Sequence, residues 1–115
     1  MMNEPLLLTH LVRRAARLFW EKRILSRTHY GVATYTYADL YRRSCQLAHA
    51  LEKLGVGPGE RVGTFAWNTF RHLELYFGVP SSGRVLHTLN IRLFPEQIAY
   101  IVNHAADSVI FVDDA

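Results

Sequence analysis

The fold is decided by residues 61–112, which read RVGTFAWNTFRHLELYFGVPSSGRVLHTLNIRLFPEQIAYIVNHAADSVIFV. Short β-branched runs alternate here with longer stretches whose apolar residues recur at helical spacing. The predicted elements are a strand at 61–66, a helix at about 69–79, a strand at 84–88, a helix at about 95–105 and a strand at 108–112. This βαβαβ run predicts an α/β fold with three parallel strands and helices shielding the sheet.

A helix and a β-hairpin are predicted before this run. Near the N-terminus, MMNEPLLLTHLVRRAARLF places apolar residues at the i, i+3, i+4, i+7 spacing of an amphipathic helix. Two β-rich runs in ILSRTHYGVATYT then predict a hairpin around His29 to Gly31, with Gly31 at the turn. We therefore divide the chain into a helix, hairpin and helix at 1–60 and a βαβαβ unit at 61–115.

The second helix is predicted to begin after Thr36. The Thr36 hydroxyl suits an N-cap, and the Asp39 carboxylate, three residues later, can accept from free backbone N–H groups at the same helix end. Gly55 predicts where this helix ends, because glycine adopts the left-handed conformation of a C-cap. The predicted apolar stripe consists of Leu40, Leu47, Ala48, Leu51 and Leu54.

Composition narrows the function classes. The 115 residues fit one ordinary domain, and 50% hydrophobic content is enough for a core. The net charge of +3 comes from basic and acidic residues spread along the chain, so no face dedicated to nucleic acid is predicted. Cys45 is the only cysteine, which indicates a reducing compartment and favours a cytoplasmic location. No apolar run approaches the roughly 18 residues that a transmembrane helix needs.

The first helix leaves two interpretations open. Its apolar residues alternate with Arg13, Arg14 and Arg17, a pattern that occurs in helices lying on a membrane surface. The same pattern is typical of a helix that packs on a core, which is the interpretation we favour. A location peripheral to a membrane is kept as the alternative.

The end of the last predicted strand lies close to Ala115. At least one edge of the parallel sheet is then left without a covering element, and such an edge is prone to aggregation. We therefore expect this sequence to be the opening part of a larger α/β domain, incomplete as a domain by itself.

Familiar self-contained catalytic motifs are missing from the sequence. It contains no GxSxG, HExxH, CxxC or GxxxxGK[ST] pattern, and none of its six histidines lies four residues from another. The glycine-rich GVGPGE at 55–60 leads from a helix into a strand, whereas phosphate-binding glycines lead from a strand into a helix. We interpret it as an ordinary turn, and we predict no metal site.

The predicted helix at 69–79 carries both apolar and polar residues. Its expected buried face consists of Phe70, Leu73, Tyr76 and Phe77. Arg71, His72 and Glu74 are interpreted as solvated, because charged residues on an amphipathic helix usually face water.

Position in the sequence makes Arg92 the best candidate for a ligand-binding residue. It follows the second parallel strand, and open α/β sheets bind their ligands beyond the carboxyl ends of the strands. Its guanidinium is permanently charged and its planar array of donors matches phosphate oxygens. A solvated loop arginine is the alternative.

Several segments together resemble the N-terminal part of AMP-forming acyl-CoA synthetases. They are TYTYADLYRRSCQLAHALEKLGVGPGERV, WNTFRHLELYFGV, VLHTLNIRLFPEQIAYIVNHA and VIFVDD. Within this family of adenylate-forming enzymes, the patterns NxxRHLExYF and VLHTxNxRL are most similar to those of bacterial medium- and long-chain fatty-acid CoA ligases. The resemblance covers nearly all 115 residues and implies the first part of the family's large N-terminal domain.

The resemblance also implies an activity. In such enzymes a fatty-acid carboxylate attacks the α-phosphate of Mg²⁺-bound ATP, and CoA then displaces AMP to give a thioester. The family's phosphate loop, aromatic-Thr-Glu motif, ribose-binding Asp and catalytic Lys would all lie beyond Ala115. We therefore expect this chain to be inactive alone and to bind none of ATP, CoA or Mg²⁺ tightly, and we predict no catalytic residue in it.

The resemblance implies one site residue. In relatives whose segment reads Asn-Pro-Arg-Leu, the arginine that corresponds to Arg92 contacts the nucleotide phosphate of CoA. This sequence departs from that pattern at Ile91, which replaces the proline, and at Phe94, where relatives often have Ser as a helix cap.

Homodimerisation through the amphipathic first helix is a further expectation from the family. A different interpretation is a non-catalytic interaction module that binds a larger partner through the uncovered sheet edge. An independent flavodoxin-like domain is a third interpretation, although WNTF offers no phosphate-binding glycine.

Overall fold

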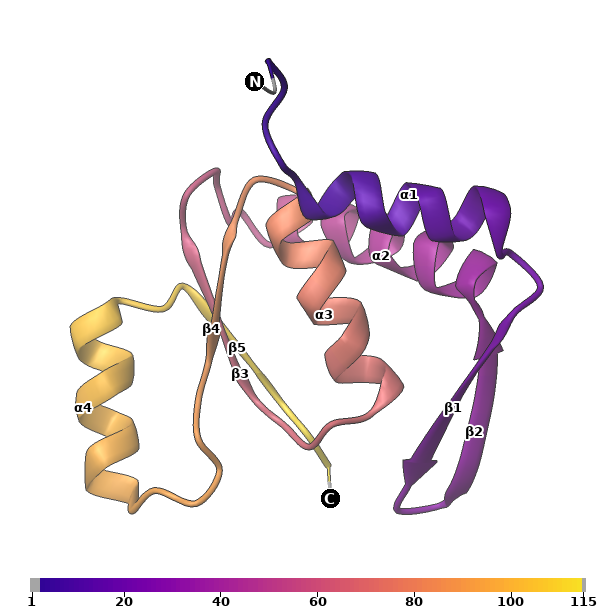
Figure 1. The fold of residues 1–115 in the computed structure, drawn as a ribbon. Coiled ribbons are helices and arrows are strands. Elements are labelled where there is room, and N and C mark those ends of the chain that lie inside the picture. Colours follow the sequence, from indigo (N-terminus) through magenta and orange to yellow (C-terminus); the bar gives the residue numbers. More distant parts are fainter. Residues whose placement is uncertain (1–2, 115) are drawn as a thin grey trace.

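The computed structural model describes residues 3–114 (Figure 1). Ala115 lies outside the described residues. In chain order the elements are α1 (Leu8–Leu18), β1 (Arg23–Thr28), β2 (Gly31–Thr36), α2 (Tyr37–Lys53), β3 (Arg61–Phe65), α3 (Phe70–Ser81), β4 (Val85–Thr88), α4 (Pro95–Ala105) and β5 (Val109–Val112). All predicted elements are present, and their ends differ from prediction by at most two residues, the usual uncertainty of such boundaries.

The main sheet has three parallel strands in the order β4-β3-β5. From β3 the chain passes through α3 to β4 on one side, then through α4 to β5 on the other side of β3. Two crossovers of the same hand that run in opposite directions place their helices on opposite faces of the sheet. Figure 1 shows this arrangement, with α3 on one face and α4 on the other. The predicted α/β fold is confirmed.

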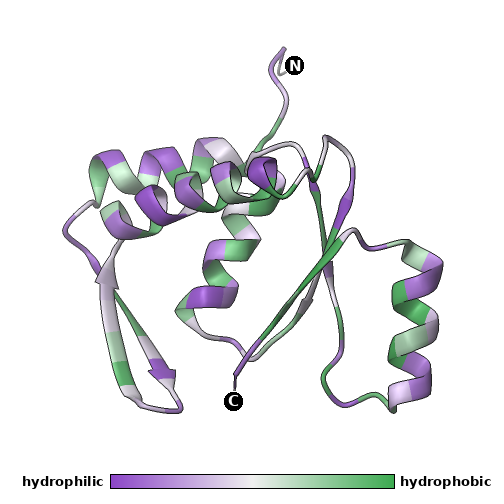
Figure 2. Cartoon of the chain, turned by 180° about the vertical axis from the view of Figure 1, so that it is seen from behind, coloured by the Kyte–Doolittle hydropathy of each residue, from purple (hydrophilic) through white to green (hydrophobic). Residues whose placement is uncertain are grey.

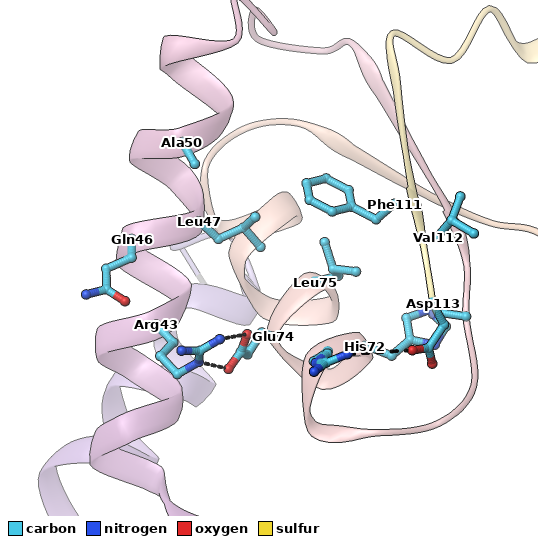
Figure 3. Close-up of a pocket in the computed structure, with 12 residues that line it drawn as sticks. Arg43, Gln46, Leu47, Ala50, His72, Glu74, Leu75, Phe111, Val112 and Asp113 are labelled. Atoms are coloured by element: carbon cyan, nitrogen blue, oxygen red, sulfur yellow. Dashed lines mark hydrogen bonds and ion pairs between the residues drawn. The ribbon is translucent and has the colours of Figure 1, made fainter. Parts of the chain in front are cut away.

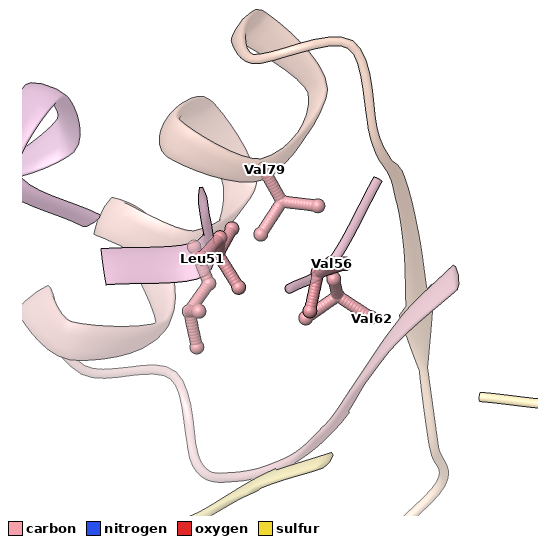
Figure 4. Packing of buried hydrophobic residues seen from close by; sticks show 5 residues of the cluster. Leu51, Val56, Val62 and Val79 are labelled. Atoms are coloured by element: carbon pink, nitrogen blue, oxygen red, sulfur yellow. The ribbon is translucent and has the colours of Figure 1, made fainter. Parts of the chain in front are cut away.

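A small aliphatic cluster joins α2 and α3 to β3 (Figure 4). Leu51, Val62 and Val79 are completely buried in it. Each comes from a different element, so the cluster fixes the two helices on one face of the sheet. Because apolar burial contributes about 25 cal/mol per Å², these side chains are a major source of the fold's stability.

The prediction for the buried face of α3 was wrong for Tyr76, while Phe70, Leu73 and Phe77 are half-buried. His72, Glu74, Leu75 and Val79 are buried, whereas Tyr76, expected in the core, is 43% exposed. The physical reason is that α3 lies between α2 and the sheet and must bury the side that faces both. The polar residues on that side have partners there, so they can be buried at low cost.

The N-terminus of α2 is capped as predicted. The Asp39 backbone N–H donates to the Thr36 hydroxyl at 3.2 Å, and the Thr36 N–H donates to the Asp39 carboxylate at 3.0 Å. This backbone hydrogen bond from Thr36 is the main reason why the pKa of Asp39 is lowered. At the other end Gly55 has φ of +79°, as the predicted stop requires. Leu54, expected in the apolar stripe, is instead 62% exposed, because α2 ends one residue before it.

Loss of this cap should be measurable. Thr36→Ala is expected to lower the free energy of unfolding by about 1 kcal/mol, because the Asp39 N–H at the start of α2 loses its acceptor. Urea-induced unfolding gives the value. The control is Thr34→Ala, which removes an exposed hydroxyl two residues earlier and should change stability by less than about 0.5 kcal/mol. Equal losses in both variants would contradict the role of the cap.

The same cap predicts a pH dependence of stability. A carboxyl group with a lowered pKa in the folded state stabilises the fold above its unfolded pKa, and this contribution is lost as the pH falls through the folded pKa.

The β1–β2 hairpin is confirmed, with one correction. The turn consists of His29 and Tyr30, and Gly31 pairs with Thr28 as the first residue of β2. A two-stranded hairpin is marginally stable alone, and this one is tied to the start of α3. The Tyr35 hydroxyl donates to the Phe70 carbonyl at 3.2 Å, and the Phe70 N–H donates to the Ser26 hydroxyl at 2.9 Å.

The outer helices differ in how they pack. Helix α1 lies against α2 and α3 with Val12 buried, while Leu8, Leu11 and Leu18 stay between 43% and 56% exposed. Helix α4 has no fully buried residue. Figure 2 shows that β5, between α3 and α4, is hydrophobic along its length. Among residues 3–114, no helix combines the length and the apolar content needed to cross a bilayer.

Candidate functional site

The order of the strands identifies the carboxyl ends of the parallel strands, called the ligand edge below, as the place for a ligand. The chain passes from β3 through α3 to β4 and from β4 through α4 to β5, so the connections that leave the carboxyl ends of β3 and β4 lie on opposite faces of the sheet. Ligands of open α/β sheets bind beyond the carboxyl ends of the strands at such a point. Trp67 follows β3, Arg92 follows β4 and Asp113 follows β5, so all three lie at this edge.

The loop that carries Trp67 is held by hydrogen bonds on both sides. The Trp67 N–H donates to the Asp113 carboxylate at 3.3 Å, and its carbonyl accepts from the Thr69 N–H at 2.9 Å. The ring nitrogen Nδ1 of His72 lies 3.2 Å from the same carbonyl. A carbonyl only accepts, so Nδ1 carries a proton, and in the neutral ring Nε2 accepts from Thr64 at 2.9 Å.

His72 therefore has a structural role that the sequence did not reveal. It joins the buried Thr64 of β3 to the loop beyond that strand, and its burial contradicts the expectation that it is solvated. The signal that could have found Trp67 and Asp113 is the one that found Arg92, namely position directly after a parallel strand.

Arg92 lies in a turn, and its guanidinium pairs with no side chain among residues 3–114. Its backbone N–H donates to the Asn90 side-chain oxygen at 3.0 Å, and the Leu93 N–H donates to the Asn90 carbonyl at 3.3 Å. The turn therefore forms with Ile91 in place of proline. The Arg92 side chain is exposed, and within residues 3–114 its guanidinium makes no ion pair or hydrogen bond.

A cavity of about 220 Å³ lies beside this turn. Its lining residues are Phe65, Ala66, Trp67, Ile91, Arg92 and Asp113. The structure thus brings the predicted site residue together with two residues that were not predicted.

The start of α4, directly after this turn, lacks the side-chain cap that a serine would provide. Phe94 at the N-cap is 73% exposed. Part of the loss is made good by Gln97, whose side-chain oxygen accepts from the Phe94 N–H at 3.1 Å.

A second cavity, of about 380 Å³, lies between α2, α3 and β5 (Figure 3). One wall is apolar and includes Leu47, Leu75 and Phe111. Beside these apolar side chains lies a two-point ion pair, in which the Arg43 guanidinium donates to both carboxylate oxygens of Glu74. This hydrogen bond raises the pKa of Arg43. Glu74 is buried, against the expectation from sequence, because Arg43 neutralises it.

Arg71 is exposed, as expected, and belongs to the acidic end of β5. Its Nη1 lies 3.1 Å from an Asp114 carboxylate oxygen and 3.8 Å from one of Asp113. The Arg71 side chain is exposed in both pairs, so they contribute little to stability. Arg71 partly neutralises the charge of Asp113 at the carboxyl end of β5.

The glycine-rich stretch at 55–60 is the turn between α2 and β3. The Glu60 carboxylate accepts the backbone N–H of Gly57, so a protein group occupies the donor that an anion would need. This hydrogen bond lowers the pKa of Glu60. The interpretation as an ordinary turn is confirmed.

Comparison with known proteins identifies relatives over the whole described chain. The family model described as AMP-binding enzyme matches residues 12–115. The chain is 53% identical over 114 residues to a long-chain-fatty-acid–CoA ligase of Thermus thermophilus, covering 98% of this chain and 21% of the relative. It is 43% identical over 115 residues to a medium-chain-fatty-acid–CoA ligase of Ectopseudomonas oleovorans, covering 99% and 21%.

Solved structures share the fold. A protein of Rhodopseudomonas palustris assigned as a long-chain-fatty-acid CoA ligase superposes with a TM-score of 0.83 at 29% identity, over 96% of this chain and 28% of that one. The anthranilate CoA ligase AuaEII superposes with a TM-score of 0.82 at 21% identity, over 96% and 21%, which shows the fold alone. The chain thus spans about a fifth of the length of its curated relatives.

Proposed function

This chain belongs to the family of AMP-binding enzymes, and from that premise we propose that it forms the N-terminal portion of an ATP-dependent fatty-acid CoA ligase. The similarity to fatty-acid CoA ligases over nearly all residues supports the substrate class. Residues 1–115 are then part of the AMP-binding domain, with the helices and hairpin of 1–60 preceding the βαβαβ unit of 61–115.

The proposed reaction has two steps. The fatty-acid carboxylate attacks the α-phosphorus of ATP, which forms an acyl-adenylate and releases pyrophosphate. The CoA thiolate then attacks the acyl carbonyl carbon, and AMP leaves with the electron pair of the cleaved bond. Among residues 3–114 no group of three or more His, Cys, Asp or Glu side chains could hold a metal ion.

Within this reaction Arg92 would contact the nucleotide phosphate of CoA. The observation that carries the assignment is a guanidinium without a partner in residues 3–114, held by a turn beside a cavity at the ligand edge of the sheet. Trp67 and Arg92 are suited to binding a ligand, since an indole stacks and a guanidinium pairs with phosphate. We propose that this chain contributes substrate binding but no catalytic residue, and that it is inactive alone.

The proposal includes a homodimer in a cytoplasmic location. The exposed Leu8, Leu11 and Leu18 on α1 support an interface there, because partly exposed apolar side chains on one helix face are typical of contact surfaces. The same residues, flanked by arginines, suit peripheral membrane attachment as the alternative.

A non-catalytic interaction module is the second candidate function. The observation in its favour is the outer edge of β5, which pairs with no strand among the described residues, with Val112 67% exposed. A partner strand could complete this edge. Recovery of the chain from cells in a stable complex with a separate larger subunit would favour this candidate over the ligase.

Substitution of Arg92 tests the assignment. In the complete ligase, Arg92→Ala is expected to raise the KM for CoA roughly 10- to 100-fold, because a charge-assisted hydrogen bond contributes about 1.5–3 kcal/mol. The KM values for ATP and fatty acid should not change. The control is Arg61→Ala, which removes an exposed arginine at the opposite, amino end of β3. An unchanged KM for CoA in Arg92→Ala would show that the assignment is wrong.

A further inference from the structure

The exposed side chain of Trp67 is unusual for the place in which it lies. Trp67 is 52% exposed although its backbone is fixed through the Asp113 carboxylate and the His72 ring. A large aromatic side chain on a fixed loop loses little conformational freedom when it binds a ligand, since the backbone is already ordered. Trp67 therefore has the properties of a preformed contact surface.

Trp67 and Arg92 line the same cavity of about 220 Å³. Trp67 also lines a neighbouring cavity of about 600 Å³ between the hairpin turn and the β3–α3 loop, where Tyr30 and Arg71 take part. Trp67 is therefore shared by the cavity that Arg92 lines and by the neighbouring cavity. A ligand in the smaller cavity can contact Trp67 and Arg92 together.

The two side chains together select a class of ligand. An aromatic side chain binds flat bases by stacking, and it does so with little dependence on their hydrogen-bonding groups. A guanidinium binds phosphate oxygens. The Asp113 carboxylate lines the same cavity and repels phosphate, so we expect the phosphate to lie close to Arg92 and away from Asp113. A base joined to a phosphate, as in a nucleotide, satisfies both side chains.

From this placement we propose that Trp67 is a binding residue whose indole stacks on the adenine of CoA while Arg92 contacts a phosphate of the same nucleotide. The inference rests on the proposed function, because CoA is the substrate assigned to Arg92 there. It adds a contact to the base, which the assignment of Arg92 alone does not include.

The test is the Kd, measured by calorimetry on the complete native polypeptide that carries these residues. The ligands are CoA and 4′-phosphopantetheine, which lacks the 3′-phospho-AMP part of CoA and with it the adenine. Trp67→Leu is expected to weaken CoA binding roughly 5- to 100-fold, the range for loss of one base–aromatic stack, and to leave 4′-phosphopantetheine binding unchanged. Trp67→Phe keeps an aromatic face and should stay within a few-fold of the wild type.

The matched control is Trp20→Leu, which removes another exposed tryptophan, 55% exposed, in the turn before β1. It should change neither Kd. An equal loss for both ligands in Trp67→Leu, or no loss for CoA, would overturn the inference.

Arg92→Ala, measured beside these variants, separates the inference from the proposed function. Weaker CoA binding in Arg92→Ala with unchanged binding in Trp67→Leu would leave the assignment of Arg92 standing and overturn the role of Trp67. Unchanged CoA binding in both variants would overturn both. Weaker CoA binding in both, with 4′-phosphopantetheine unaffected by Trp67→Leu, is the result that we expect.

Discussion

Leu51→Ala is expected to lower the free energy of unfolding by about 3 kcal/mol, the largest effect that we predict. Leu51 is completely buried at the point where α2 meets Val62 of β3 and Val79 of α3. Truncation removes the transfer free energy of three carbon atoms and leaves a cavity that rigid neighbours on two helices and a strand fill only partly. Urea-induced unfolding of the chain measures the loss.

The neighbouring Leu54 provides a matched control. It is the same residue type at the end of the same helix, but it is 62% exposed. Leu54→Ala should therefore change the free energy of unfolding by less than about 0.5 kcal/mol. If the two variants lost the same stability, the cluster around Leu51 would not be the core that positions the sheet.

Gly78→Val is expected to lower the free energy of unfolding by about 2 kcal/mol, the second largest effect. A Cβ at Gly78 would lie 2.7 Å from Cδ2 of Leu47 and 3.1 Å from the Ser44 carbonyl oxygen, so α3 and α2 are too close for any side chain there. Elsewhere in a helix, replacing glycine by a residue with a side chain usually gains stability. Steric contact with the backbone of α2 outweighs that gain here.

A double-mutant cycle identifies the cause of this loss. Leu47→Ala removes the side-chain half of the collision, so Gly78→Val should cost about 1 kcal/mol less in that background than in the wild type. Circular dichroism of each variant confirms that the helices remain. Strict additivity of the two substitutions would contradict packing of Gly78 against Leu47.

Local signals in the sequence were sufficient for much of the fold. The cap of Thr36 and Asp39, the stop at Gly55 and the alternation of strands and helices each depend on residues within a few positions of one another. Such signals do not require knowledge of what lies across the fold. The direction of the strands also followed, since βαβ crossovers are almost always right-handed.

Burial of α3 could not be predicted because it depends on tertiary partners. His72 and Glu74 are buried only because Thr64 of β3 and Arg43 of α2 lie opposite them. The sequence of α3 does not indicate which residues of β3 and α2 will lie opposite it. A pattern of charges on an amphipathic helix therefore gave the wrong face.

The sequence predicted where the candidate site lies, but it predicted only one of its residues. Arg92 lies at the ligand edge, as its place after a strand indicated. Trp67 and Asp113 satisfy the same rule, but the strand order β4-β3-β5 had to be known before it was clear that they meet Arg92. Contact of Arg92 with CoA stays a prediction.

The central claim is that these residues form the N-terminal part of an acyl-CoA ligase. The mass of the native polypeptide tests this claim most directly. An antibody raised against residues 1–115 detects that polypeptide in an extract of the source cells. The account predicts one species several times the 13.2 kDa of these 115 residues. One species near 13.2 kDa would contradict it.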